Sequence, residues 1–156
     1  MPKTAGKKAT AADADTVMKL YDLRRESEMR KARNWYGNAD FSSWEPVQKV
    51  MMGWGTPENA WMRQVLSYWE NAAALVLRGA VHQDLFFDWN GEIIFTYVKI
   101  KPYLKQIREV SGSDEFMQNT EKLLNSTPAL KKRVIWMEGQ FKKWAEMMKA
   151  KAAGKS

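Results

Sequence analysis

His82 is the only histidine of the 156-residue chain, and the chain contains no cysteine. A lone imidazole cannot build a common zinc site, and the lack of thiols excludes disulfides, thiolate metal sites and thiol catalysis. With Asp84 nearby, His82 could act in acid–base chemistry. We favour the alternative, an ordinary polar residue just after a helix end, where a cation is stabilised. The sequence therefore predicts no catalytic residue, no metal site and no cofactor.

An oxygen-rich stretch resembles part of a calcium-binding loop. When Gly91 takes the sixth position of such a loop, Phe86 falls at the first position and Tyr97 at the twelfth. The first ligand and the bidentate acid are therefore both missing. We expect instead a loop whose Asp and Asn side chains cap the following helix. The residues concerned are Asp84, Asp88, Asn90, Gly91 and Glu92.

The stretch Gly53-Trp54-Gly55-Thr56 is too short for a phosphate loop, because it lacks the further glycines and the lysine of that motif. A glycine-rich helix start can still bind an anion, but we favour a simple loop. Trp54 is the notable residue, since a tryptophan between two glycines is expected to be exposed. An exposed loop tryptophan is a plausible anchor for a partner protein.

Arg25 interrupts the apolar face of a helix expected over residues 13–36. It is a possible anion site or buried-ion site. The alternatives are an internal salt bridge, or a side chain that reaches solvent from the edge of the apolar face. We favour a structural role, because perturbed ionic groups are often structural.

Eight tryptophans and ten methionines are many for this length and could form a ligand pocket or an adaptable partner groove. Most lie on helical inner faces, where core packing is the default role. The segment 141–151 is basic and amphipathic, with Phe141, Trp144 and Met148 on one face. Such a helix could lie on an anionic membrane or contact phosphates, but more often it packs on its own domain or on a second copy. We therefore predict partner binding at Trp54, Phe141, Trp144 and Met148.

The formal net charge of +7 resides at the two ends of the chain. Residues 1–12 carry +3 and residues 141–156 carry +4, so residues 13–140 are formally neutral. Composition thus gives no argument for a basic face on the folded part. Non-specific nucleic-acid binding through the ends is possible, and it would use Lys3, Lys7, Lys8, Lys142, Lys143, Lys149, Lys151 and Lys155.

The segment from Gly91 to Val110 is the expected centre of the fold. Its apolar residues recur at helical spacing over so wide an arc that neighbours must cover them. Pro102 predicts a kink or two abutting helices. The rival interpretation is a hairpin over residues 85–98, since Asn-Gly favours a tight turn, but we favour the helix because the helical period continues to Ile107.

The remaining start and stop signals for helices predict a single all-α domain of about six or seven helices. Thr56-Pro57-Glu58 is a strong start for a helix that ends at Arg78, and Ser126-Thr127-Pro128 starts the last one. Further helices are expected over residues 13–36, 40–54 and 113–125, with a short helix or turn over 80–89. We expect the helical domain to span residues 13–149, with flexible lysine- and alanine-rich tails over 1–12 and 150–156.

A resemblance rests on several short strings of residues spread over residues 17–125. They are Leu23-Arg24-Arg25-Glu26, Arg33-Asn34-Trp35-Tyr36, Phe41-Ser42-Ser43-Trp44-Glu45, Arg78-Gly79, Pro102-Tyr103 and Arg108. Together they resemble the DUF4760 family of uncharacterised bacterial all-helical domains. The resemblance implies an all-helical fold and no particular activity.

These observations favour a non-enzymatic helical interaction or structural module, with a protein partner or self-association. Two alternatives stay open: non-specific nucleic-acid binding through the basic tails, and an enzyme or small-molecule binder with a tryptophan-lined pocket. No apolar run is long enough to span a membrane, and no apolar core follows the N-terminal lysines as in a secretory signal. We therefore expect a cytoplasmic protein, with membrane-surface contact unfavoured.

Overall fold

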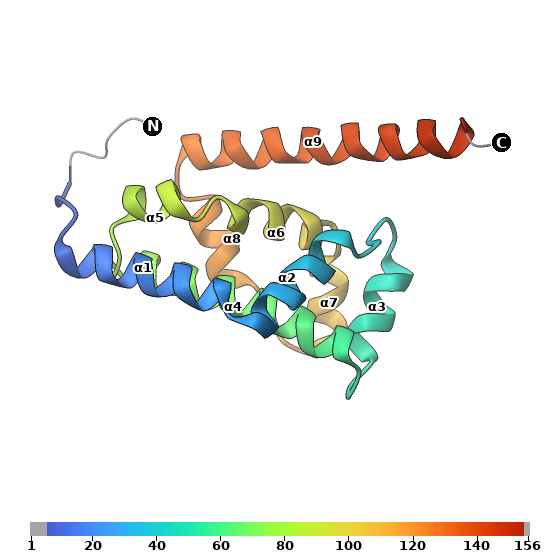
Figure 1. The fold of residues 1–156 in the computed structure, drawn as a ribbon, viewed down its shortest axis with the longest axis horizontal. Coiled ribbons are helices and arrows are strands. Elements are labelled where there is room, and N and C mark those ends of the chain that lie inside the picture. The colour runs from blue at the N-terminus through green and yellow to red at the C-terminus, as the bar shows by residue number, and fades with distance from the viewer. Residues whose placement is uncertain (1–5, 155–156) are drawn as a thin grey trace.

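A computed structural model describes residues 6–154, and within this range it contains helices and no strand (Figure 1). The predicted all-α fold is thus confirmed. No helix in residues 6–154 combines the length and the apolar character needed to cross a bilayer. In chain order the elements are α1 (Ala11–Arg25), α2 (Ser27–Asn38), α3 (Trp44–Met52), α4 (Pro57–Leu77), α5 (Gln83–Trp89), α6 (Glu92–Ile100), the 3-10 helix η1 (Lys101–Tyr103), α7 (Leu104–Ser111), α8 (Gln118–Leu124) and α9 (Pro128–Ala153).

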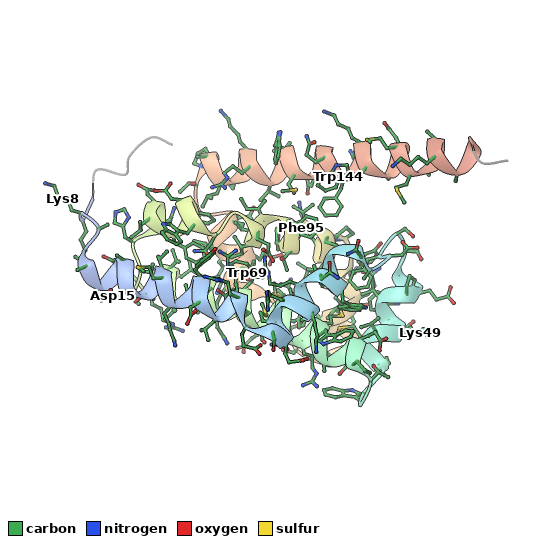
Figure 2. The ribbon with its side chains drawn as sticks, viewed as in Figure 1. Lys8, Asp15, Lys49, Trp69, Phe95 and Trp144 are labelled. Carbon is green, nitrogen blue, oxygen red and sulfur yellow. The ribbon has the colours of Figure 1, made fainter. Side chains whose placement is uncertain are left out.

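Helix α4 is the element on which α2, α3 and α8 pack. It starts as the sequence predicts, because the Thr56 hydroxyl accepts a hydrogen bond from the Asn59 amide and Pro57 occupies the first turn. Its inner face is completely buried, with Trp69 in the middle of the molecule (Figure 2). This helix therefore positions residues from both sides of the core.

The expected central segment is divided at Pro102. Helix α6 ends at Ile100, and the 3-10 helix η1, which contains Pro102, leads into α7. Proline has no backbone N–H to donate, which explains the change from α-helix to 3-10 helix at this point. The prediction of two abutting helices is therefore confirmed. Residues 85–98 form the helices α5 and α6, and the hairpin alternative is wrong. Seven of the nine residues of α6 are buried, which agrees with its wide apolar arc.

The single helix expected over residues 13–36 is wrong, because the chain breaks at Glu26 into α1 and α2. Glu26 is extended (ψ 142°), and its carboxylate accepts hydrogen bonds from the amides of Glu28 and Met29. It thus caps α2 with its own side chain. This break and the division at Pro102 both add helices, so six or seven is too low a count for the described residues.

The ends of the helical domain differ from the expected limits of 13 and 149. Helix α1 already begins at Ala11, with Thr10 and Asp13 forming a reciprocal capping box. Helix α9 continues to Ala153, so residues 150–153 are helical rather than tail. The flexibility expected for the outermost residues stays a prediction.

The last helix is only partly covered by the rest of the molecule. Its first half packs on α6 and α8, whereas every residue from 142 to 153 is exposed. Figure 1 shows α9 on the side of the molecule opposite α4, with its C-terminal end running past the bundle. We call residues 142–153 the α9 overhang.

Candidate functional site

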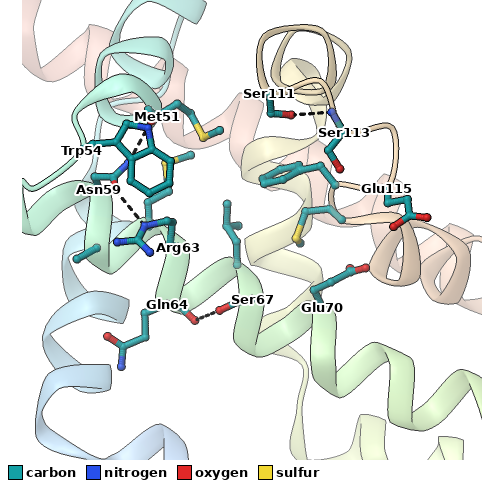
Figure 3. A pocket seen from close by; sticks show the side chains of 15 residues that line it. Met51, Trp54, Asn59, Arg63, Gln64, Ser67, Glu70, Ser111, Ser113 and Glu115 are labelled. Carbon is teal, nitrogen blue, oxygen red and sulfur yellow. Dashed lines mark hydrogen bonds between the residues drawn. The ribbon is translucent and has the colours of Figure 1, made fainter.

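A groove of about 640 Å³ lies between α4 and the segment 111–117 (Figure 3). Met62 and Leu66 of α4 form its floor, with Met51 and Trp54 on one wall and Phe116 and Met117 on the other. We call it the Trp54 groove. An apolar groove with flexible methionines can adapt to the shape of an apolar ligand or side chain.

Trp54 is 71% exposed, as expected from its position between two glycines. The guanidinium carbon of Arg63 lies 5.0 Å from the centre of its ring. The Nε of Arg63 donates to Oδ1 of Asn59 at 3.0 Å, and the Asn59 Nδ2 donates to the carbonyls of Val50 and Met51 at 3.0 and 3.1 Å. Asn59 is itself buried. This chain of contacts holds an exposed tryptophan in place. The sequence identified Trp54 but not Arg63 and Asn59, which support it.

The opposite wall of the groove is fixed by Glu70. Its carboxylate accepts hydrogen bonds from the backbone amide and Nδ2 of Asn119 at 2.8 and 2.9 Å. It also accepts from the amide and hydroxyl of Thr120 at 3.0 and 2.8 Å. Met117, directly before α8, has φ 55°, and its thioether side chain makes no capping hydrogen bond. Glu70 therefore caps α8 from a distant helix and anchors the adjoining wall.

The groove beneath α9 brings together the other three residues predicted to bind a partner. Phe141, Trp144 and Met148 line a hollow of about 550 Å³, which we call the α9 groove. The ring centre of Phe95 in α6 lies 5.2 Å from that of Phe141 and 6.3 Å from that of Trp144 (Figure 2). Trp54 belongs to the other groove, so the four predicted residues form two separate sites.

Lys99 lies at the α9 groove, and sequence analysis did not single it out. Its ammonium donates to the carbonyls of Tyr36 and Gly37 at 2.6 and 3.0 Å, near the end of α2. It also lies 5.3 Å from the centre of the Phe41 ring. Burial lowers the pKa of Lys99 to about 8, against the smaller opposing effect of Asp40. The amine therefore stabilises the packing of α6 on α2 while carrying a desolvation cost.

Replacing Lys99 with methionine is expected to change the pH dependence of stability. The pKa of Lys99 is about 8 in the folded chain and near 10.5 in the unfolded one, so between these values the unfolded state binds more protons. The cost of burying the ammonium is complete below pH 8 and is relieved as pH rises. Urea unfolding of both proteins should show the wild type gaining stability relative to Lys99→Met between those two pH values. The same comparison with Lys105→Met, an exposed site, should show no such trend; equal trends would contradict the assignment.

The prediction of a partly buried cation at Arg25 is wrong. The buried cation is its neighbour, Arg24. Arg25 is exposed, whereas Arg24 is only 8% exposed. The Nη1 of Arg24 lies 3.6 Å from Oε2 of Glu92, and the Nε of Arg33 donates to Oε1 of the same carboxylate at 2.8 Å. Arg24 lies on the same face of α1 as the buried Val17 and Leu20, so this face presents it to the core. The buried-ion site is thus a structural cluster of two arginines around Glu92.

His82 has a structural role, but it lies at the start of helix α5 rather than just after a helix end, so the expected role beside a helix C-terminus is wrong. Its Nδ1 accepts a hydrogen bond from the Leu85 amide at the start of α5, and its own amide donates to Asp13. The expectation that Asp and Asn side chains cap the helix after Gly91 is wrong, since α6 has no side-chain cap. Asn90 instead donates from Nδ2 to the carbonyl of Phe86 in α5. Across residues 6–154, no group of three His, Asp or Glu side chains is placed to hold a metal ion.

The lysines proposed for nucleic-acid binding do not form one patch. Lys7 and Lys8 precede α1, while the others described belong to the α9 overhang: Lys142, Lys143, Lys149 and Lys151. These two groups lie at opposite ends of the molecule (Figures 1 and 2). Lys3 and Lys155 lie outside the described residues. Nucleic-acid binding stays a prediction.

A family model described as a domain of unknown function (DUF4760) matches residues 9–127, so the chain belongs to this family. The match ends directly before α9, which begins at Pro128. No curated protein and no solved structure matches the chain.

Proposed function

We propose that this DUF4760 member is a non-enzymatic interaction module that binds a protein partner through the α9 overhang. The observation that carries the proposal is the exposure of large apolar side chains on that helix. Trp144 is 43% exposed, Met147 57% and Met148 66%. Leaving apolar area in water forgoes about 25 cal/mol per Å². A helix that extends past its domain with such residues is typical of a binding surface.

The distribution of residues around the overhang supports the same proposal. Trp144, Met147 and Met148 are three and four residues apart and therefore share one face, which we call the apolar stripe. Lys142, Glu146 and Lys149 follow the same spacing on the opposite face. Recognition of an amphipathic helix by a groove uses anchors at this spacing.

The buried ionisable groups support a non-enzymatic role. Arg24 and Arg33 hold Glu92, and the ammonium of Lys99 donates to two backbone carbonyls. His82 caps α5. Each of these groups already has a structural partner, so none of them is held ready for proton transfer or nucleophilic attack.

Photo-crosslinking in living cells tests the proposal. A photoreactive benzoyl-phenylalanine in place of Met148 is expected to give a discrete protein adduct, because the partner covers this position. The same residue in place of Met18, an exposed methionine of α1, serves as the matched control and should give none. Adding Met147→Asp should lower the adduct yield about tenfold, the effect of about 1.4 kcal/mol of binding free energy. Equal adducts from both positions would refute binding through the overhang.

A further inference from the structure

We infer that the partner of the α9 overhang is a second copy of this chain, whose Trp54 groove receives the apolar stripe. The inference rests on the proposed function and adds the identity of the partner. It joins two exposed apolar surfaces of the same molecule: the stripe, whose Trp144 and Met148 border the α9 groove but stay 43% and 66% exposed, and the Trp54 groove.

The two surfaces match in chemistry. The stripe offers Trp144, Met147 and Met148 from one helical face. The groove offers Trp54 on its open edge, with half-buried Met51 and Phe116 on its walls. Tryptophan is enriched among the residues that dominate interface energies, and methionine adjusts to the shape of its neighbour. Contact between the stripe and the Trp54 groove buries apolar area on both surfaces.

Charge favours this pairing over two overhangs packing against each other. The overhang carries Lys142, Lys143, Lys149 and Lys151 against Glu146. The ionisable side chains that line the Trp54 groove are Arg63, Glu70 and Glu115, which sum to a negative charge. Those lining the α9 groove are Lys99, Lys101, Lys142, Asp40 and Glu138, which sum to a positive charge. A basic helix is therefore attracted to the Trp54 groove and repelled by a second overhang.

The contact has to be made between molecules. The α9 overhang runs along one side of the molecule, and the loop between α3 and α4, which contains Trp54, lies on the opposite side (Figure 1). Two different surfaces then meet in a head-to-tail arrangement, which closes into a ring or continues as a chain of molecules. Each copy donates one helix and accepts another.

The head-to-tail arrangement makes a prediction that pairing through identical surfaces does not make. Met147→Asp/Met148→Asp disrupts the stripe and keeps the groove, while Trp54→Asp disrupts the groove and keeps the stripe. Each variant should be an 18.1 kDa monomer in sedimentation velocity. An equimolar mixture should form a one-to-one complex, because one variant supplies the helix and the other the groove. The wild type should show a mass that grows with concentration, at about 10–100 µM for a contact at the small end of the interface range.

The controls separate folding and charge from the contact itself. All three substituted residues are exposed, and thermal unfolding should confirm that each variant is folded. Met18→Asp/Leu23→Asp adds the same charge at exposed sites of α1 and should associate like the wild type. The mixed complex should weaken as salt rises, since opposite charges help to form it.

Three results would overturn the inference. A wild type that stays monomeric over this range excludes a second copy as the partner. An associating wild type whose mixed variants stay monomeric places the receiving surface elsewhere. In both cases a Met148 crosslink to a protein would leave the proposed function standing. If the Met147→Asp/Met148→Asp variant associates as the wild type does and position 148 also gives no crosslink, both proposals fail.

Discussion

Replacing Glu92 with alanine is expected to lower the free energy of unfolding by about 3 kcal/mol, the low end of the range for breaking a buried ion pair. The side chains of Arg24, Arg33 and Glu92 are 9%, 28% and 25% exposed, so none of them is fully solvated. Removing the carboxylate leaves two guanidinium groups close together without their shared counter-charge. Urea unfolding at neutral pH and low salt measures the effect.

The effect should depend on burial rather than on the loss of a salt bridge as such. Glu28→Ala breaks the ion pair with Lys31, whose side chain is 62% exposed while that of Glu28 is 55% exposed. That loss should cost less than about 0.5 kcal/mol, as for other exposed pairs within one helix. Glu92→Gln keeps the size of the side chain and should fall between the two. Equal costs for Glu92→Ala and Glu28→Ala would show that the arginine cluster contributes nothing beyond a surface pair.

Sequence predicts this fold best where one residue type decides the local backbone. Thr56 and Pro57 mark the start of α4 within a residue, and Pro102 marks the division between α6 and α7. In each case the missing N–H of a proline or the hydroxyl of a capping residue fixes the backbone of the residues directly beside it. Such effects need no knowledge of the rest of the chain.

The break at Glu26 escaped prediction because glutamate is not among the preferred capping residues. The flanking sequence keeps its helical pattern through the break, so periodicity alone predicts one helix. The same break explains why Arg25 was chosen and Arg24 missed. A helical face extrapolated through residues 13–36 places the wrong arginine on the apolar side, whereas α1 ends at Arg25 and buries Arg24.

The two grooves show a similar limit. Phe141, Trp144 and Met148 could be grouped from their spacing along one helix, and the structure places them in one groove. Phe95 and Lys99, on the opposite side of that groove, both precede Phe141 by more than forty positions. The supports of the Trp54 groove also depend on tertiary contacts, such as the one between Glu70 and Thr120. No local pattern in the sequence encodes these pairings.

Replacing Glu70 with alanine is expected to lower the free energy of unfolding by about 3 kcal/mol, since a hydrogen bond to a charged group contributes about 1.5–3 kcal/mol and this carboxylate accepts several. Its four donors belong to Asn119 and Thr120. Thr120 is fully buried, so its hydroxyl loses its partner without gaining access to water. Urea unfolding again measures the loss, and Glu58→Ala, an exposed acid in the first turn of the same helix, is the control.

The loss of Glu70 should loosen the first turn of α8 more than it loosens the rest of the molecule. Met117 supplies no side-chain cap, so without Glu70 the first turn of α8 has no replacement acceptor. Hydrogen exchange of the Asn119 and Thr120 amides should therefore accelerate more than that of the α4 core around Trp69. Because Phe116 and Met117 form the adjoining wall of the Trp54 groove, the head-to-tail association inferred above should weaken in the same variant. Unchanged exchange at both amides would show that Glu70 does not hold α8, and the groove wall would then need another support.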